Sequence, residues 1–160
     1  MLCLHRFTDM TPQKARELGL SALLVDLDNT LVPPHAPLPT DEALSWLQTM
    51  RDAGIAVMIV SNNDENRVGT FCNACEPSLD GLWKAAKPFP HKLRAAMKRL
   101  GVTPAETGFM GDQLFTDMLA AVLSGTRPIL TDPQVAETDR FFRFKRACER
   151  LILPERRYIS

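Results

Sequence analysis

The amino-acid sequence predicts an α/β fold, a three-layer sandwich in which a mainly parallel sheet lies between helices, formed by one domain over residues 1–160. Short apolar runs of strand character alternate along the chain with segments of helical periodicity, which is typical of a parallel sheet. Polar clusters follow directly after several apolar runs, where the strands of an open α/β sheet bind ligands. The hydrophobic content of 45% is sufficient for a core at this length.

Five short segments are predicted as strands because they are apolar, rich in branched residues and bounded by glycine, proline or charged residues. The second is the clearest and the third is the weakest. In chain order the predicted strands are Ala22–Val25, Ile55–Val60, Leu79–Trp83, Thr107–Met110 and Arg127–Leu130.

Between these strands, three segments show apolar residues at helical spacing with recognisable ends. The first begins after Thr40, the expected N-cap, and ends at Gly54. The other two span Phe89–Leu100 and Leu114–Leu123, and each is followed closely by a glycine. The proline-rich residues 33–39 are predicted as a stiff loop, either a plain connector or a flap beside a binding site.

A last helix is predicted over Thr138–Leu153, with an apolar stripe that would pack on the sheet. A second stripe of this helix is basic and includes Arg143, Arg146 and Arg150. A solvated helix face is the simplest interpretation of that stripe. Peripheral contact with anionic lipid, or with RNA, is the functional alternative.

Composition limits the classes of partner and compartment. Nineteen basic and nineteen acidic residues cancel, so no overall charge attracts the chain to nucleic acid. The first residues lack the long apolar core of a signal peptide, and no apolar run reaches membrane-spanning length, so we expect a cytoplasmic protein. Four cysteines fit a reduced compartment. For the C-x-x-C pair of Cys72 and Cys75, two small buried side chains are favoured over a zinc site or a redox pair.

The strongest functional signal is a pair of aspartates, Asp26 and Asp28, directly after the first predicted strand. Successive strand residues point to opposite faces, so the two carboxylates would share one side if the strand continued. Paired carboxylates there would act as nucleophile and general acid/base in phosphoryl transfer, or hold a divalent metal. The ordinary alternative is turn chemistry, since Asp and Asn both favour tight turns.

Three further polar motifs follow later strands: Ser61–Asn63, Lys87-Pro88 and Gly111–Asp117. A hydroxyl with adjacent N–H groups holds phosphoryl oxygens, a lysine supplies a compact positive charge, and a further carboxylate completes an oxygen shell for Mg²⁺. Taken singly, each motif has an ordinary explanation, such as a capping loop or a surface lysine, and Lys84 competes with Lys87 for its role. Their joint occurrence at one sheet edge predicts a phosphoryl-transfer site.

With these four motifs in order, the chain resembles the haloacid dehalogenase (HAD) superfamily of phosphatases. Within it, Asp-Leu-Asp-Asn-Thr-Leu-Val, Ser-Asn-Asn, Lys-Pro and Gly-Asp-Gln-x-x-Thr-Asp resemble the YqeG group. That group comprises HAD IIIA-type enzymes related to mitochondrial phosphatidylglycerophosphatases. The resemblance runs from about Thr11 to Arg150 and implies a HAD-like Rossmannoid fold. One departure is Ala120-Ala121-Val122, where the group is expected to have a Gly-Gly-Asn-like run.

The resemblance implies catalytic roles for the residues that match the first two motifs. Asp26 would be the nucleophile, and Asp28 the general acid/base. Thr30 would hold the loop and orient Asp28. Ser61 would bind a phosphoryl oxygen, with help from the backbone N–H of Asn62.

The resemblance also implies a Mg²⁺ site. Asp26 would bind the metal through its second oxygen, and Asp28 through its backbone carbonyl. Asp112 would be a direct ligand, whereas Asp117 would act through water or by orienting its neighbours. Lys87 would steady the nucleophile and the developing charge. Asn63 and Gln113 would be orienting residues.

The spacing of the motifs bears on the substrate. HAD enzymes for small metabolites often carry a cap domain, and neither the interval from Asp28 to Ser61 nor that from Asn63 to Lys87 is long enough for one. A capless, open site suits a phosphate on something large, and oligomerisation is the other way to enclose a small substrate. A lipid phosphate such as phosphatidylglycerophosphate is the leading substrate by resemblance. A soluble sugar phosphate, nucleotide or phosphoprotein is the alternative, and a weakly active phosphate- or RNA-binding module is a rival of another class.

Overall fold

The computed structural model describes residues 1–34 and 36–135. Their core is a six-stranded sheet in the order β1-β6-β5-β2-β3-β4, and every pair of neighbouring strands is parallel. This sheet confirms the predicted α/β class. The strands are β1 (Leu2–Leu4), β2 (Ala22–Val25), β3 (Ala56–Val60), β4 (Gly81–Leu82), β5 (Thr107–Gly111) and β6 (Arg127–Thr131).

The five predicted strands are all present; β2 has the predicted bounds, and the other four differ at their ends by one or two residues. The edge strand β1, which has three residues and pairs with β6, is not among the predicted strands. Three residues are too few to display an alternating pattern, so tertiary pairing defines this strand.

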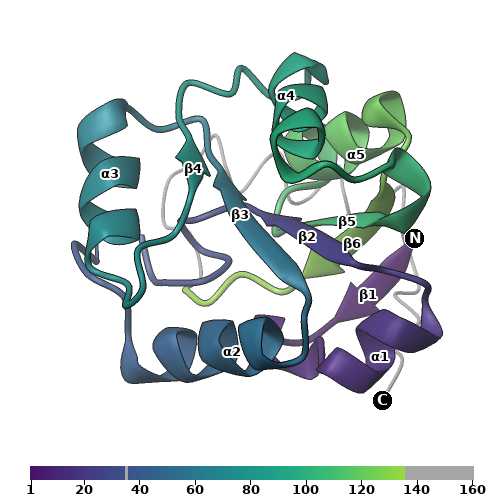
Figure 1. Ribbon diagram of the computed structural model, residues 1–160. Coiled ribbons are helices and arrows are strands. Elements are labelled where there is room, and N and C mark those ends of the chain that lie inside the picture. Colours follow the sequence, from purple (N-terminus) through teal and green to yellow (C-terminus); the bar gives the residue numbers. More distant parts are fainter. Residues whose placement is uncertain (35, 136–160) are drawn as a thin grey trace.

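Helices cover both faces of the sheet, which gives three layers (Figure 1). One apolar cluster joins β2 residues Leu23 and Val25 to α1, α2 and α3, and a second joins Leu24 to α4 and α5. Successive side chains of β2 therefore pack into the apolar core on alternate faces of the sheet, as expected for a strand that is buried on both faces. The helices are α1 (Pro12–Glu17), α2 (Asp41–Asp52), α3 (Glu65–Asn73), α4 (His91–Leu100) and α5 (Leu119–Ser124).

The predicted helix ends are largely confirmed. The Thr40 hydroxyl accepts a hydrogen bond from the backbone N–H of Ala43 and caps α2. The segment predicted as a helix over Phe89–Leu100 becomes helical only at His91, since Pro90 takes the cap position. The segment Leu114–Leu123 opens with a π-helical turn, η3 (Leu114–Met118), before α5. The predicted helix over residues 138–153 lies outside the described residues.

Among the described residues, the connections between the strands hold short loops and helices and no inserted cap domain. The proline-rich loop and α2 fill the connection from β2 to β3, and α3, β4 and a loop lead from β3 to α4. Among the described helices, none combines the length and the apolar character needed to cross a bilayer.

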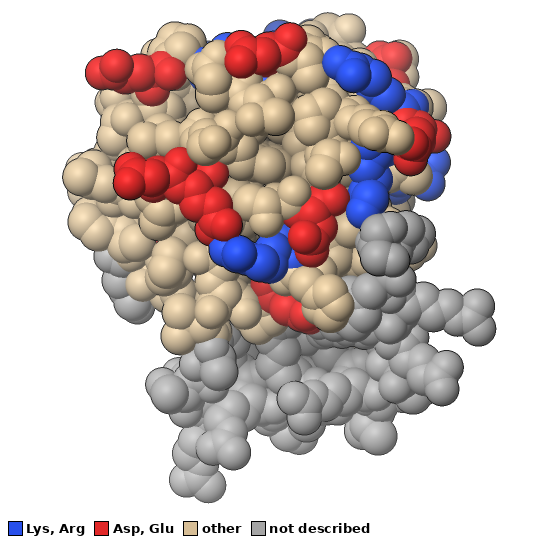
Figure 2. Space-filling view, turned by 90° about the horizontal axis from the view of Figure 1, so that it is seen from below, with Lys and Arg blue, Asp and Glu red and all other residues tan. Residues whose placement is uncertain are grey.

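On the visible part of the face that carries α1 and α2, basic and acidic side chains are interspersed (Figure 2).

Candidate active site

All four motifs lie at the carboxyl edge of the sheet, because every strand is parallel. Asp26 directly follows β2, Ser61 follows β3 and Asp112 follows β5. Lys87 lies in the loop between β4 and α4. Residues that are far apart in the sequence therefore meet at one edge, as open α/β sheets generally arrange their ligand sites.

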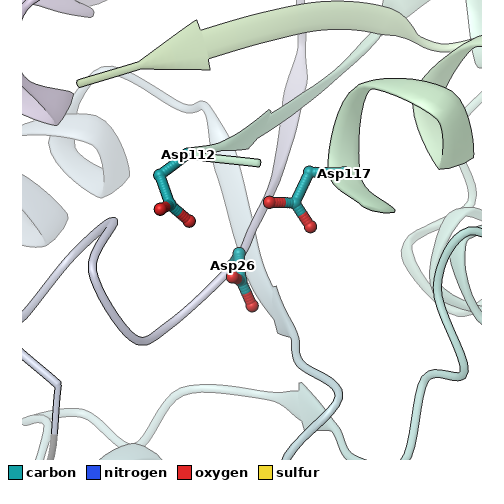
Figure 3. A group of neighbouring side chains, drawn as sticks. All are labelled: Asp26, Asp112 and Asp117. Atoms are coloured by element: carbon teal, nitrogen blue, oxygen red, sulfur yellow. The ribbon is translucent and has the colours of Figure 1, made fainter. Parts of the chain in front are cut away.

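Three carboxylates meet at this edge: those of Asp26, Asp112 and Asp117 (Figure 3). One ligand oxygen from each lies within 4.8 Å of the others, and their residues are 7%, 0% and 1% exposed. Gly111 makes this packing possible, since a Cβ there would lie 2.5 Å from Oδ2 of Asp117. The backbone N–H of Gln113 donates to the same oxygen at 3.0 Å and holds Asp117 in place.

The buried ammonium of Lys87 lies between two of these carboxylates. Its Nζ is 2.7 Å from Oδ1 of Asp26 and 2.8 Å from Oδ1 of Asp117, and it lies 5.3 Å from the ring centroid of Phe109. Burial alone would lower the pKa of Lys87, but the carboxylates of Asp117 and Asp26 outweigh burial and raise that pKa above its ordinary value. Lys87 is therefore a permanent positive charge inside the site, whereas its competitor Lys84 is exposed.

The carboxyl group of Asp26 has a perturbed pKa. Burial raises it from the ordinary value of 3.8 to about 6, although Lys87 partly opposes the rise and Asp117 adds to it. An acid whose pKa is raised by desolvation and coupled to specific charges at a sheet edge is typical of a functional site.

The carboxylate cluster fits a divalent metal ion. All of its donors are oxygens, the ligand type that Mg²⁺ prefers in proteins. The three carboxylates concentrate negative charge in a buried space, where Lys87 pairs with Asp26 and Asp117, and a divalent cation would neutralise charge there. Asp26, Asp112 and Asp117 are the residues that would hold it.

The Ser-Asn-Asn motif forms hydrogen bonds with two of the other motifs, those of Lys87 and Asp28. The Ser61 hydroxyl is buried and accepts a hydrogen bond from the backbone N–H of Asn63. The Asn62 side chain accepts from the backbone N–H of Lys87 at 2.8 Å, which fixes the loop that carries the lysine. The Asn63 amide donates to Oδ2 of Asp28.

The side chain of Asp28 lies outside the three-carboxylate cluster. Its Oδ1 is 2.7 Å from Nη2 of Arg67, and its Oδ2 accepts from Asn63. Arg67 is not among the predicted site residues. No sequence pattern marks this arginine, since its partner Asp28 lies 39 positions earlier in the chain.

Thr30 and Asn29 form a buried tight turn after Asp28. Asn29 has a φ of +65°, in the region that asparagine tolerates better than most residues. The Thr30 carbonyl accepts from the Gln134 side chain, and the backbone N–H of Gln134 donates to the Asn29 carbonyl. The Thr30 hydroxyl has no hydrogen-bond partner among the described residues.

The remaining highlighted residues lie outside the cluster or support it. Cys72 and Cys75 are buried on the α3 side of the sheet, and burial raises the pKa of both thiols, that of Cys72 to about 12. Within residues 1–34 and 36–135, neither cysteine belongs to a group that could hold a metal ion. The Gln113 side chain accepts from the Thr116 hydroxyl.

Comparison with known proteins identifies the class. The model of the family described as "haloacid dehalogenase-like hydrolase" matches residues 11–125. The chain therefore belongs to the haloacid dehalogenase-like hydrolases, as its fold and its four motifs predict.

A curated relative narrows the group. The "Probable phosphatase YqeG" of Bacillus subtilis (strain 168) is 38% identical over 146 residues, which cover 90% of this chain and 83% of the relative. The chain is thus a HAD phosphatase of the YqeG type, and the resemblance inferred from its motifs is confirmed.

Solved structures show the same fold at low identity. The cobalt-bound deoxy-D-mannose-octulosonate 8-phosphate phosphatase (YrbI) from Haemophilus influenzae aligns with a TM-score of 0.57 at 17% identity, covering 86% of this chain and 90% of that chain. A second match is the 3-deoxy-D-manno-octulosonate 8-phosphate phosphatase from Moraxella catarrhalis, solved in complex with a magnesium ion, a phosphate ion and a KDO molecule. It aligns with a TM-score of 0.51 at 16% identity and covers 89% of this chain and 90% of that chain.

Proposed function

We propose that this phosphatase is a Mg²⁺-dependent phosphomonoester hydrolase that works through an aspartyl-phosphate on Asp26. The observation that carries the proposal is the buried set of three carboxylates, two of which contact the ammonium of Lys87. A simple structural ion pair needs one carboxylate for each lysine, so the additional carboxylates point to a cation and an anionic substrate. The magnesium and phosphate in the Moraxella enzyme's complex support the same choice.

In the first step, an Asp26 oxygen attacks phosphorus. The bond from phosphorus to the ester oxygen breaks, its electron pair goes to that oxygen, and Asp28 donates a proton to the departing alcohol. Lys87 holds Oδ1 of Asp26 at 2.7 Å, so the nucleophile has one orientation.

In the second step, Asp28 accepts a proton from water as the water oxygen attacks phosphorus. The bond between phosphorus and the Asp26 oxygen breaks, its electrons return to the carboxylate, and inorganic phosphate leaves. The Ser61 hydroxyl and the N–H of Asn62 would bind the phosphoryl oxygens in both steps. When bound by Asp26, Asp112 and Asp117, Mg²⁺ would offset the repulsion between the anionic nucleophile and the anionic phosphoryl group.

The test of this proposal is hydrolysis of p-nitrophenyl phosphate with Mg²⁺. We expect Asp26→Asn and a chelator each to remove activity, and mass spectrometry of quenched wild-type enzyme to find phosphate on the peptide that contains Asp26. Activity that survives Asp26→Asn would contradict the mechanism. Tight phosphate or RNA binding without turnover, across a broad panel of esters, would favour a binding module.

We propose a lipid phosphate as the substrate class because of the surface beside the site. Phe115, Leu119 and Val122 are 37%, 41% and 62% exposed and lie at helical spacing on η3 and α5, in the segment that follows Asp112. A short helix that is apolar on its solvent side as well as on its buried side is unusual in water. This apolar face would rest on a membrane.

The charges beside this apolar face favour an anionic lipid surface as its occupant. Arg94 and Lys98 are exposed on the neighbouring α4, and Nη2 of Arg94 donates to the carbonyl of Leu123 on α5. Neither α4 nor α5 contains an acidic residue. An apolar strip with a basic flank matches the acyl boundary and headgroups of an anionic bilayer.

Sedimentation with vesicles tests this docking surface. We expect Leu119→Glu and Val122→Glu to reduce binding to phosphatidylglycerol vesicles at least tenfold, with unchanged activity on p-nitrophenyl phosphate. Gln48→Glu, on the opposite layer of the sandwich, is the charge-matched control. Wild-type protein that ignores the vesicles, together with a soluble sugar phosphate or nucleotide as the preferred ester, would favour the soluble alternative.

A further inference from the structure

Arg67 reaches the predicted acid/base residue from a separate helix. It lies in the first turn of α3, and its Nη2 is 2.7 Å from Oδ1 of Asp28. Because Asn63 donates to Oδ2, both oxygens of the Asp28 carboxylate have a donor from the segment that follows β3. The two donors together restrict the rotation of this carboxyl group.

Arg67 is itself held in place. Its backbone N–H donates to the side chain of Asp64, the N-cap of α3, at 2.8 Å. Its Nη1 donates to the carbonyl of Pro37 in the proline-rich loop at 3.4 Å. The side chains of Arg67 and Asp28 are only 18% and 22% exposed. The guanidinium is thus held at two points, by Asp28 and Pro37, and the backbone of the same residue at a third. It is a rigid support, because its planar fork loses little freedom for each bond that it makes.

We propose that Arg67 is a positioning residue that aims the Asp28 carboxyl group at the ester oxygen of the bound substrate. The proposal rests on the proposed function, since it assumes that Asp28 transfers the proton. Among the described residues, the Thr30 hydroxyl makes no hydrogen bond, so Arg67 and Asn63 supply the support for Asp28. The contact with Pro37 also places the proline-rich loop beside the site.

The role makes a prediction about leaving groups. An alkoxide is strongly basic and needs a proton as it departs, whereas p-nitrophenolate is weakly basic and departs without one. A misaligned general acid should therefore slow the cleavage of alkyl phosphates far more than that of aryl phosphates. General acid–base catalysis contributes about 10²–10⁴-fold, which bounds the size of the effect.

The experiment compares kcat/KM for p-nitrophenyl phosphate and for glycerol 3-phosphate in the Mg²⁺-loaded enzyme. For each ester, kcat/KM reports only the steps up to departure of the alcohol, so slow hydrolysis of the aspartyl-phosphate does not affect kcat/KM. We expect Arg67→Met to reduce the alkyl phosphate value about 30-fold or more, and the aryl value less than about threefold. The kcat/KM of Arg67→Lys for the alkyl phosphate should lie between those of wild type and Arg67→Met, since one ammonium replaces part of the guanidinium fork.

Two comparisons make the result specific. Arg51→Met is the matched control, since Arg51 also bonds main-chain carbonyls, those of Glu76 and Pro77, but lies far from the carboxyl edge. Asp28→Asn should show the same leaving-group contrast, and Arg67→Met should add nothing to it if the two residues act together. Thermal unfolding shows whether each variant is folded. If Arg67→Met is unfolded, the two esters are compared in Arg67→Lys instead.

Equal losses on both esters, or no loss on either, would overturn the role of Arg67 and leave the proposed function intact. Additive losses in the Asp28→Asn background would overturn it as well. Full activity of Asp26→Asn would instead contradict the aspartyl-phosphate mechanism, whatever the arginine variants do.

Discussion

Replacing Asp26 by asparagine is expected to stabilise the metal-free protein at neutral pH. Burial raises the pKa of the Asp26 carboxyl group from 3.8 to about 6 despite the nearby Lys87 ammonium. Ionising this group is therefore harder in the folded protein than in the unfolded chain. The difference corresponds to about 3 kcal/mol, since each pKa unit is worth about 1.4 kcal/mol.

The sign of the pH dependence follows from the same values. Between pH 3.8 and about 6 the folded protein retains a proton on Asp26 that the unfolded chain releases, so stability falls as the pH rises through this range. Above it, the whole cost of about 3 kcal/mol is present. An asparagine imitates the protonated form and avoids this cost, while Lys87 keeps its ion pair with Asp117 at 2.8 Å.

Differential scanning calorimetry with a chelator present measures this effect. For a chain of this size, about 3 kcal/mol corresponds to a gain in Tm of about 6–12 °C at pH 7.5. Near pH 4.5 the advantage should shrink to about 1 kcal/mol, because wild-type Asp26 is then mostly protonated in the folded state. An Asp26→Asn protein that melts below wild type at pH 7.5, or a gain that does not change with pH, would refute the reasoning.

Three further outcomes follow from the cluster. Adding Mg²⁺ at 100 times its Kd should raise the unfolding free energy of wild type by about 2.7 kcal/mol at pH 7.5, and Asp112→Asn should show almost no gain by calorimetry. Gly111→Ala should weaken Mg²⁺ binding at least tenfold by titration calorimetry, because its Cβ would displace Asp117, whereas Gly69→Ala, with nothing within 4 Å, should not. Lys87→Met should cost about 3–5 kcal/mol in urea unfolding without metal, since it leaves two buried carboxylates without their cation, and unchanged stability would contradict that role.

Much of the fold and the grouping of the motifs could be predicted because both follow from local sequence and one topological rule. Apolar runs identified five of the six strands found within the described part of the chain. The requirement that parallel strands end at one edge predicts that Asp26, Lys87 and Asp112 lie together. The structure brings Lys87 within 2.7 Å of Asp26 and places Asp112 in the same carboxylate cluster.

The missed features depend on tertiary contacts that no periodicity records. Arg67 looked like an ordinary helix residue, because its contact with Asp28 joins positions 39 apart in the sequence. The π-helical turn at η3 replaces a regular helix start where Asp117 must approach Gly111. The strand β1 is defined by its pairing with β6. Each of these features is visible only when separate segments are already in place.

The same cluster that would perform catalysis also carries an energetic cost, and this links the metal to the stability of the fold. Two of the three buried carboxylates, those of Asp26 and Asp117, share one lysine, so without a divalent cation the site concentrates negative charge that burial makes expensive. The rise in the pKa of Asp26 is one measure of that cost. Selection for stability alone would replace one of these acids by a neutral residue, as the expected gain from Asp26→Asn indicates. The acids are therefore best explained by a metal ion and a phosphoryl group that bind to the folded protein and offset the cost when they arrive.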